Sequence, residues 1–89
     1  MRRAARIDDN QPDIIRALRM IGAQVEIIGK PVDLLVHYRG ETFLIECKAL
    51  DGRLTKDQVE FIARWPGKIH IAKSADEAVA LVVGKEAMR

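Results

Sequence analysis

Two β-rich segments separated by the dipeptide Arg39-Gly40 place the strongest constraint on how this chain folds. They cover residues 32–38 and 42–48, and both combine β-branched, leucine and aromatic side chains. A two-residue loop at the dipeptide predicts a β-hairpin in which the flanking residues face each other. A four-residue loop centred on the same point keeps that register, whereas a three-residue loop breaks it.

The distribution of apolar residues selects between these registers. With the two-residue loop, one face collects only apolar and aromatic side chains, namely Val32, Leu34, Val36, Tyr38, Phe43, Ile45 and Cys47. The other face takes the polar side chains together with two leucines, namely Asp33, Leu35, His37, Thr42, Leu44, Glu46 and Lys48. A slip by one residue would turn a whole strand over, so the segregated register is favoured.

Capping and turn residues divide the rest of the chain into three helices and two further strands. Helices are expected from Asn10 as N-cap to Gly22, from Thr55 with Gln58 as its capping-box partner to Pro66, and from Ser74 with Glu77 to Gly84. The further strands are expected at residues 23–28 and 68–72. The predicted order is αβββαβα, an α/β (α+β) fold with a small mixed sheet and helices packed on it.

The length of 89 residues allows one domain, residues 1–89, with residues 1–9 as a flexible basic arm and 84–89 as a tail. A chain of this size buries only about two-thirds of the surface that its unfolded form exposes, which favours a homodimer. Fifteen Lys and Arg against thirteen Asp and Glu give a net charge of +2, too mild to indicate nucleic-acid binding by itself.

Cysteine content and hydropathy exclude several other classes of protein. The single Cys47 excludes a disulfide framework and a Cys-based zinc site within one chain. The first ten residues lack the apolar stretch of a secretory signal, and the longest apolar run, residues 78–83, is too short to span a membrane. A cytoplasmic protein without a membrane partner is therefore expected.

The favoured register sets Asp33 directly opposite Glu46, with their Cβ atoms roughly 5 Å apart. Opposed like charges destabilise a sheet, whereas Mg²⁺ or Mn²⁺ binds one or two carboxylates together with waters and phosphate. Lys48 lies on the same face, where it would hold or activate an attacking water and offset charge on a phosphodiester. The ordinary alternative is an exposed strand face, on which Glu and Lys two residues apart are common.

Four stretches of the chain resemble the VRR-NUC (virus-type replication–repair nuclease) family of the PD-(D/E)XK nuclease superfamily. They are DDNQPDIIRALRMIGAQV at 8–25, PVDLLV at 31–36, FLIECK at 43–48 and LTKDQVEF at 54–61. The resemblance is to small stand-alone members from phages and bacteria, and it covers residues 8 to about 83. It implies a restriction-endonuclease-like PD-(D/E)XK core and a bacterial or phage-infected host cytoplasm.

The resemblance also implies roles for the central residues of the site. Asp33 and Glu46 would bind the metal, the main-chain carbonyl of Cys47 would be a further ligand, and Lys48 would be the catalytic lysine. Gln58 matches a glutamine on the following helix that approaches the active site in relatives. It is also the position at which a capping box requires Gln, and the two interpretations are compatible.

Many relatives complete the site with an acid on the first helix, and no acid of this chain falls cleanly on that position. Gln11 is the first candidate for a contact to the metal or its water, and Asp8 is the second. Ordinary helix capping is the alternative for both.

Basic and aromatic residues near the predicted site are candidate contacts to DNA. Arg53 and Lys56 flank the site, and Arg6 belongs to the basic arm, so these three are the predicted phosphate contacts, although such residues are often only solvated surface. Phe61 and Trp65 lie one helical turn apart, which normally indicates packing. Trp65 could instead anchor a dimer or stack on a base.

These observations predict a Mg²⁺- or Mn²⁺-dependent DNA endonuclease that recognises branched or otherwise structured DNA. The specific expectation is a homodimeric Holliday-junction (four-way junction) resolvase, in which two sites match the symmetry of the junction. The alternatives are a flap or nicking nuclease with the same site, a catalytically idle nucleic-acid-binding module or subunit, and a structural domain with an incidental acid pair. In the metal-free protein, removing Asp33 from a metal site should leave stability unchanged or raised.

Overall fold

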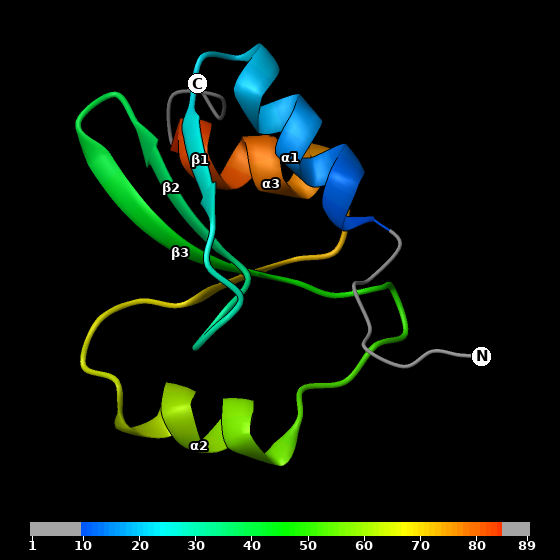
Figure 1. Ribbon diagram of the computed structural model, residues 1–89, viewed down its shortest axis with the longest axis vertical. Coiled ribbons are helices and arrows are strands. Elements are labelled where there is room, and N and C mark those ends of the chain that lie inside the picture. The colour runs from blue at the N-terminus through cyan, green and yellow to red at the C-terminus, as the bar shows by residue number, and fades with distance from the viewer. Residues whose placement is uncertain (1–9, 85–89) are drawn as a thin grey trace.

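The computed structural model describes residues 10–84 as a mixed α+β fold in the predicted order αβββαβα (Figure 1). The elements are α1 (Gln11–Met20), β1 (Gln24–Ile27), β2 (Leu34–Tyr38), β3 (Glu41–Cys47), α2 (Lys56–Arg64), β4 (His70–Ala72) and α3 (Ala75–Val83). The predicted arm, which includes Arg6 and Asp8, and residues 85–89 of the predicted tail lie outside the described residues.

The four strands form one sheet in the order β1-β2-β3-β4. Its first two strand pairs are antiparallel, and β4 runs parallel to β3 because α2 connects them. Tyr38 pairs with Glu41 and Leu34 with Ile45, which confirms the register predicted from the apolar pattern. Arg39 and Gly40 both have positive φ, 49° and 85°, as a two-residue type I′ turn requires.

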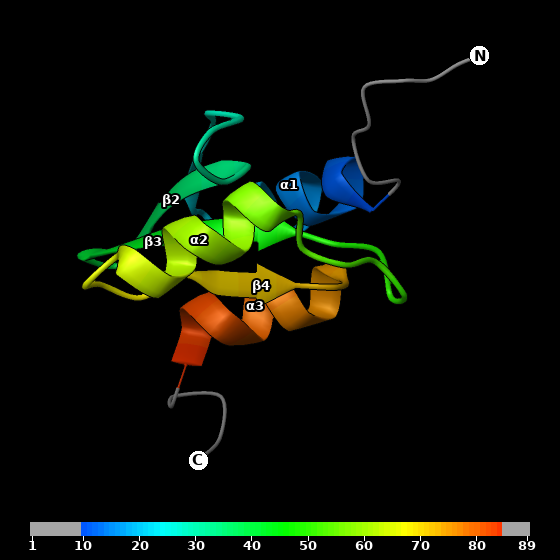
Figure 2. The same cartoon turned by 90° about the horizontal axis from the view of Figure 1, so that it is seen from below.

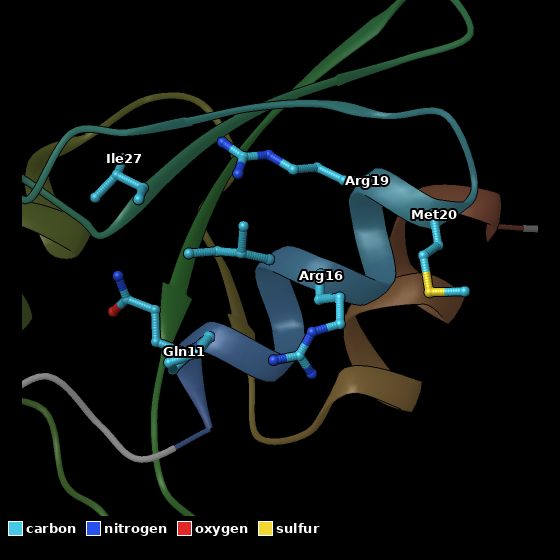
Figure 3. Close-up of a pocket in the computed structure, with 7 residues that line it drawn as sticks. Gln11, Arg16, Arg19, Met20 and Ile27 are labelled. Atoms are coloured by element: carbon cyan, nitrogen blue, oxygen red, sulfur yellow. The ribbon is translucent and has the colours of Figure 1, made fainter.

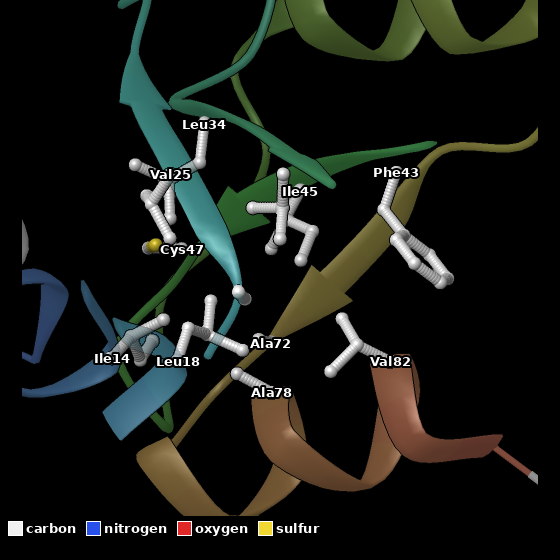
Figure 4. Packing of buried hydrophobic residues seen from close by; sticks show 12 residues of the cluster. Ile14, Leu18, Val25, Leu34, Phe43, Ile45, Cys47, Ala72, Ala78 and Val82 are labelled. Carbon is white, nitrogen blue, oxygen red and sulfur yellow. The ribbon is translucent and has the colours of Figure 1, made fainter. Parts of the chain in front are cut away.

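The two faces of the sheet have different partners. The buried face packs against α1 and α3 and forms one apolar cluster (Figure 4), whose largest fully buried members are Ile14, Leu18, Leu34, Val36, Ile45 and Cys47. Helix α2 lies across the opposite face, in front of β3 and β4 when the molecule is viewed from below (Figure 2). Glu46 belongs to that second face, because Ile45 and Cys47 on either side of it point into the core.

The start of α1 differs from the prediction. Asn10 is the N-cap residue, but its side chain makes no capping hydrogen bond, because its backbone (φ −84°, ψ −7°) is helical rather than extended. Its Nδ2 instead donates to the main-chain oxygens of Lys48, at 2.9 Å, and Lys73, at 2.8 Å. Asn10 therefore joins the start of α1 to the residues that directly follow β3 and β4.

The other two predicted caps are present, one of them in altered form. Thr55 and Gln58 make a complete capping box at α2. At α3 the Ser74 hydroxyl accepts from the Glu77 N–H at 3.1 Å, but the Glu77 carboxylate accepts from the N–H of Lys73, at 2.7 Å, instead of that of Ser74. Both predicted helix starts are thus confirmed, and only the box at Ser74 is wrong in its second hydrogen bond.

None of the three helices within residues 10–84 has both the length and the apolar character required to cross a membrane. The longest, α1, has ten residues, whereas a transmembrane helix requires about 20.

Substituting Asn10 by Ala is expected to lower the free energy of unfolding by about 2 kcal/mol, since two hydrogen bonds to main-chain oxygens are lost at about 1 kcal/mol each. Urea unfolding followed by circular dichroism measures the change. Asp13→Ala is the matched control, because it removes only an exposed ion pair with Arg16 and should cost less than about 0.5 kcal/mol. Equal losses in the two variants would show that Asn10 does not hold these elements together.

Candidate metal-binding and catalytic site

Asp33 lies directly before β2 and links three parts of the sheet. Its main-chain oxygen accepts from the N–H groups of Ile28 and Gly29, at 2.9 and 3.2 Å. Its carboxylate Oδ2 accepts from the main-chain N–H of Cys47 at 2.9 Å. The side chain thereby extends the β2–β3 pairing by one step beyond Leu34 and Ile45, and it brings the Asp33 carboxylate beside the end of β3, where Glu46 and Lys48 are located.

Glu46 is a buried carboxylate with two unequal oxygens. The residue is 3% exposed. Its Oε2 accepts a 2.6 Å hydrogen bond from Nε2 of Gln58 and lies 3.4 Å from Nζ of Lys48. Its Oε1 is buried and has no hydrogen-bond partner. A buried acceptor left without a partner costs about 1–3 kcal/mol, so this oxygen is a natural position for a ligand.

The electrostatic environment makes ionised Glu46 unfavourable in the folded protein. Burial raises the pKa of the Glu46 carboxyl above its ordinary value, and the nearby charge of Asp33 raises it further. The hydrogen bond from Gln58 and the ammonium of Lys48 lower the pKa of the same group but do not offset the increase. A bound cation would reverse this balance, because it favours the ionised form of both acids.

Lys48 is held both through its main chain and through its side chain. Its N–H donates to the Ala72 oxygen at 3.0 Å and its own main-chain oxygen accepts from Asn10. The side chain is only 13% exposed and directs its ammonium toward Glu46. The hydrogen bond between Asn10 and Lys48 is a tertiary contact across 38 positions, which no local pattern predicts.

Gln58 makes both of the interactions that its position suggested. Its Oε1 accepts from the Thr55 N–H at 2.9 Å and completes the capping box, while its Nε2 donates to Glu46. Both ends of one amide are therefore used, which orients the Glu46 carboxylate relative to the first turn of α2. The capping box and the site are two functions of the same side chain.

The other predicted site residues are not part of this hydrogen-bonded cluster. Gln11 is buried and lines a groove beside α1 that extends to Ile27 of β1 (Figure 3). Arg53 and Lys56 are exposed on the loop before α2 and on its first turn. Arg6 and Asp8 lie outside the described residues. A contact of any of these five residues with metal or DNA stays a prediction.

The carboxylates of Asp33 and Glu46 are suitable ligands for a hard cation that takes few ligands from the protein. Among residues 10–84, no group of three or more His, Cys, Asp or Glu side chains is placed to hold a metal ion. Two carboxylates are nevertheless the usual protein contribution to a Mg²⁺ site, in which waters and substrate oxygens complete the shell. The buried Oε1 of Glu46 without a partner is the feature that fits such an ion. Cys47 could contribute only its main chain, because its side chain is buried in the core.

Comparison with protein-family models, with curated proteins and with solved structures returns no match for this chain. The resemblance to VRR-NUC nucleases therefore stays a prediction, as do the roles of Asp33, Glu46, Lys48 and Gln58.

Substituting Glu46 by Gln in the metal-free protein is expected to change stability in a pH-dependent way. The raised pKa means that the folded state retains the Glu46 proton to higher pH than the unfolded chain, so ionisation costs stability as the pH rises above 4.5. The unfolding free energy of Glu46→Gln relative to wild type should therefore increase from about pH 4 to about pH 8, as measured by urea titrations in EDTA. Glu41→Gln, which removes an exposed strand carboxylate, corrects for the general effect of charge. A decrease instead would mean that attraction to Lys48 outweighs burial.

The hydrogen bond from the Cys47 N–H to Asp33 changes the expected effect of removing Asp33 on the stability of the metal-free protein. Asp33→Ala is expected to lower the unfolding free energy by about 1–3 kcal/mol without metal, since the buried N–H of Cys47 loses its acceptor. This corrects the expectation that removing Asp33 leaves stability unchanged. Asp33→Asn retains an oxygen acceptor and removes the charge beside Glu46, so it should be at least as stable as wild type. A loss in Asp33→Asn equal to that in Asp33→Ala would show that the charge itself is structural.

Proposed function

We propose that this protein is a metal-dependent nuclease that hydrolyses phosphodiester bonds in DNA. The observation that carries the proposal is the buried Glu46 carboxylate, which keeps one oxygen without a hydrogen bond beside Asp33 and the Lys48 ammonium. Asp33 has a structural role through the Cys47 N–H, but fold stability does not account for the buried Glu46 carboxylate beside it, because desolvation and like charge both disfavour its ionised form. A divalent cation and a phosphate group are the ligands that this combination of charges suits.

In the proposed mechanism Asp33 and Glu46 would hold the ion. Mg²⁺ or Mn²⁺ bound there would act as a Lewis acid and lower the pKa of a water molecule bound to it. Gln58 holds Oε2 of Glu46, which leaves Oε1 as the oxygen available to a ligand. Lys48 provides a positive charge that can orient the attacking water and stabilise negative charge on the phosphoryl group in the transition state. Asn10 fixes the main chain at Lys48.

The same features support a PD-(D/E)XK-type core. The acid before β2, the acid and lysine two residues apart at the end of β3, and a glutamine on the following helix occur in the order that the resemblance implies. The sheet brings the acid–lysine pair and Asp33 together through the Cys47 N–H. The Cys47 carbonyl remains the proposed third protein ligand.

The specific substrate proposed is branched DNA, with a homodimer acting on a four-way junction. Several large apolar side chains are exposed on the single chain, among them Met20 and Leu50, both at 80%, and Ile27 at 59%. Contact with a second copy would remove such surface from water. We expect a dimer by light scattering at micromolar concentration, and a monomer there would remove the basis for the two-site model.

Cleavage assays test the nuclease itself. We expect labelled DNA to be cut with Mg²⁺ or Mn²⁺ but not in EDTA, and Asp33→Asn and Glu46→Gln each to reduce the rate by about 100-fold or more, since a removed charge at a metal site typically costs several kcal/mol of transition-state stabilisation. Both substitutions preserve shape and hydrogen bonding, and Glu41→Gln is the matched surface control. Single-stranded, duplex, flap and four-way substrates distinguish a resolvase from a flap or nicking nuclease.

Two results would contradict the proposal in different ways. Cutting that survives both substitutions would place the activity elsewhere or in a contaminant. Intact DNA with every substrate and metal, together with retained DNA binding, would favour the alternative of an idle binding module or of a subunit that requires a partner.

A further inference from the structure

Helix α2 carries a column of flat side chains that is adjacent to the candidate site. The rings of Phe61 and Trp65 are stacked, with centroids 5.2 Å apart and an angle of 29° between their planes. The guanidinium carbon of Arg64 lies 5.3 Å from the centroid of Phe61. We call these three residues the α2 stack. Phe61 and Arg64 lie three residues apart in the helix, and Trp65 is the C-cap residue that directly follows it, with an extended backbone.

Packing in the main core does not explain the α2 stack. Helix α2 has no buried residue, and no side chain of α2 belongs to the apolar cluster between the sheet and the other two helices. The chain has only four aromatic residues, and two of them are in this stack. Trp65 is 41% exposed, and a Cβ at Gly67 would lie 2.9 Å from its indole nitrogen, so this glycine makes room for the ring.

A cleft of about 610 Å³ lies between this helix and the loop before β2. Its walls include Lys30 and Pro31 on the loop, and Gln58, Phe61 and Arg64 on α2. Gln58 also holds the Glu46 carboxylate, so the cleft and the candidate site share this residue. Two cations and an aromatic ring therefore line a cleft that adjoins the acid pair through Gln58.

We infer that the α2 stack and the adjoining cleft bind an unpaired stretch of nucleic acid, with bases against the rings and phosphates at Lys30 and Arg64. The position of this surface beside a scissile phosphate rests on the proposed nuclease function. Bases expose their faces for stacking only when they are unpaired, and arginine and aromatic side chains are the groups on which such bases stack. The substrate class assigned is thus branched DNA that carries a single-stranded segment, as a flap does, and among the substrates considered above this inference favours a flap over a fully paired four-way junction.

The carboxylates at the cleft agree with bases more than with a bare phosphate track. Asp57 and Glu60 also line it, and they offset the two positive charges. Carboxylate oxygens can accept hydrogen bonds from the amino groups on base edges, whereas they repel phosphates. The affinity should accordingly depend only weakly on salt. In a plot of the logarithm of the binding constant against the logarithm of the salt concentration, the magnitude of the slope should fall by about 0.7 for each cation removed.

Trp65 is the only tryptophan of the chain, so its fluorescence reports on the stack directly. The full-length protein in EDTA is titrated with an unlabelled 12-nucleotide single strand and, separately, with the matching perfect duplex. We expect saturable quenching by the single strand and at least about tenfold weaker binding of the duplex. Phe61→Leu and Arg64→Ala should each weaken single-strand binding about tenfold, the size of effect expected from one lost stacking contact.

Arg16→Ala is the matched control for Arg64→Ala, because it removes an exposed arginine from α1, on the opposite face of the sheet, and should leave binding within about twofold. Phe61→Leu retains an apolar side chain, and thermal unfolding checks that each variant is folded at the assay temperature. The inference is overturned if the single strand does not quench Trp65, if the duplex binds equally well, or if Arg16→Ala weakens binding as much as Arg64→Ala does.

A second copy of the chain is the rival occupant of the α2 stack. In that case Trp65 fluorescence would change with protein concentration in the absence of DNA, and the single strand would not compete, which would also overturn the inference. Because the titration is done without metal, its result is separate from the cleavage assay. Quenching without cleavage would refute only the nuclease, and cleavage without quenching would refute only the stacking surface.

Discussion

The register of the β2–β3 hairpin is the constraint on which the rest of the structure depends. Two consecutive residues with positive φ at Arg39 and Gly40 close the hairpin after two residues, and this places all of its apolar side chains except two leucines on the face that α1 and α3 cover. Asp33 and Glu46 are then left together on the opposite face, at the far end of the hairpin from the turn. The same register therefore determines both the hydrophobic core and the position of the acid pair.

The position of the acid pair, Asp33 and Glu46, lowers the stability of the fold when Glu46 is ionised. Glu46 loses hydration and lies near Asp33, and the two groups that compensate, Gln58 and Lys48, both contact the same oxygen. An apolar side chain at this position would avoid the penalty. The arrangement is understandable if the missing partner is a ligand, since a divalent cation would satisfy the second oxygen and neutralise both acids at once.

Helix α2 connects this site to the molecular surface. None of its residues is fully buried, and Gln58 attaches its first turn to Glu46. Toward its other end lies a stack of Phe61, which is partly buried, with Arg64 and Trp65, which are exposed. A helix attached in this way can present a binding surface at a defined distance from the acids without contributing to the core. Because α2 has little packing of its own, the capping box at Thr55 is important for its stability. The box provides acceptors for the main-chain N–H groups of Thr55 and Gln58 at the start of the helix.

Local sequence determined the order of the elements, the hairpin register and the capping box of α2, because each follows from apolar periodicity or from residues within a few positions of one another. The register in turn placed Asp33 opposite the end of β3. Tertiary structure decided the rest. Asn10 bonds to Lys48 and Lys73 instead of capping its helix, and these partners are 38 and 63 residues away, beyond the reach of any local pattern. Likewise, only the packed sheet gives Asp33 the Cys47 N–H as a partner and leaves one oxygen of Glu46 buried without one, because burial and hydrogen-bond satisfaction are properties of assembled surfaces.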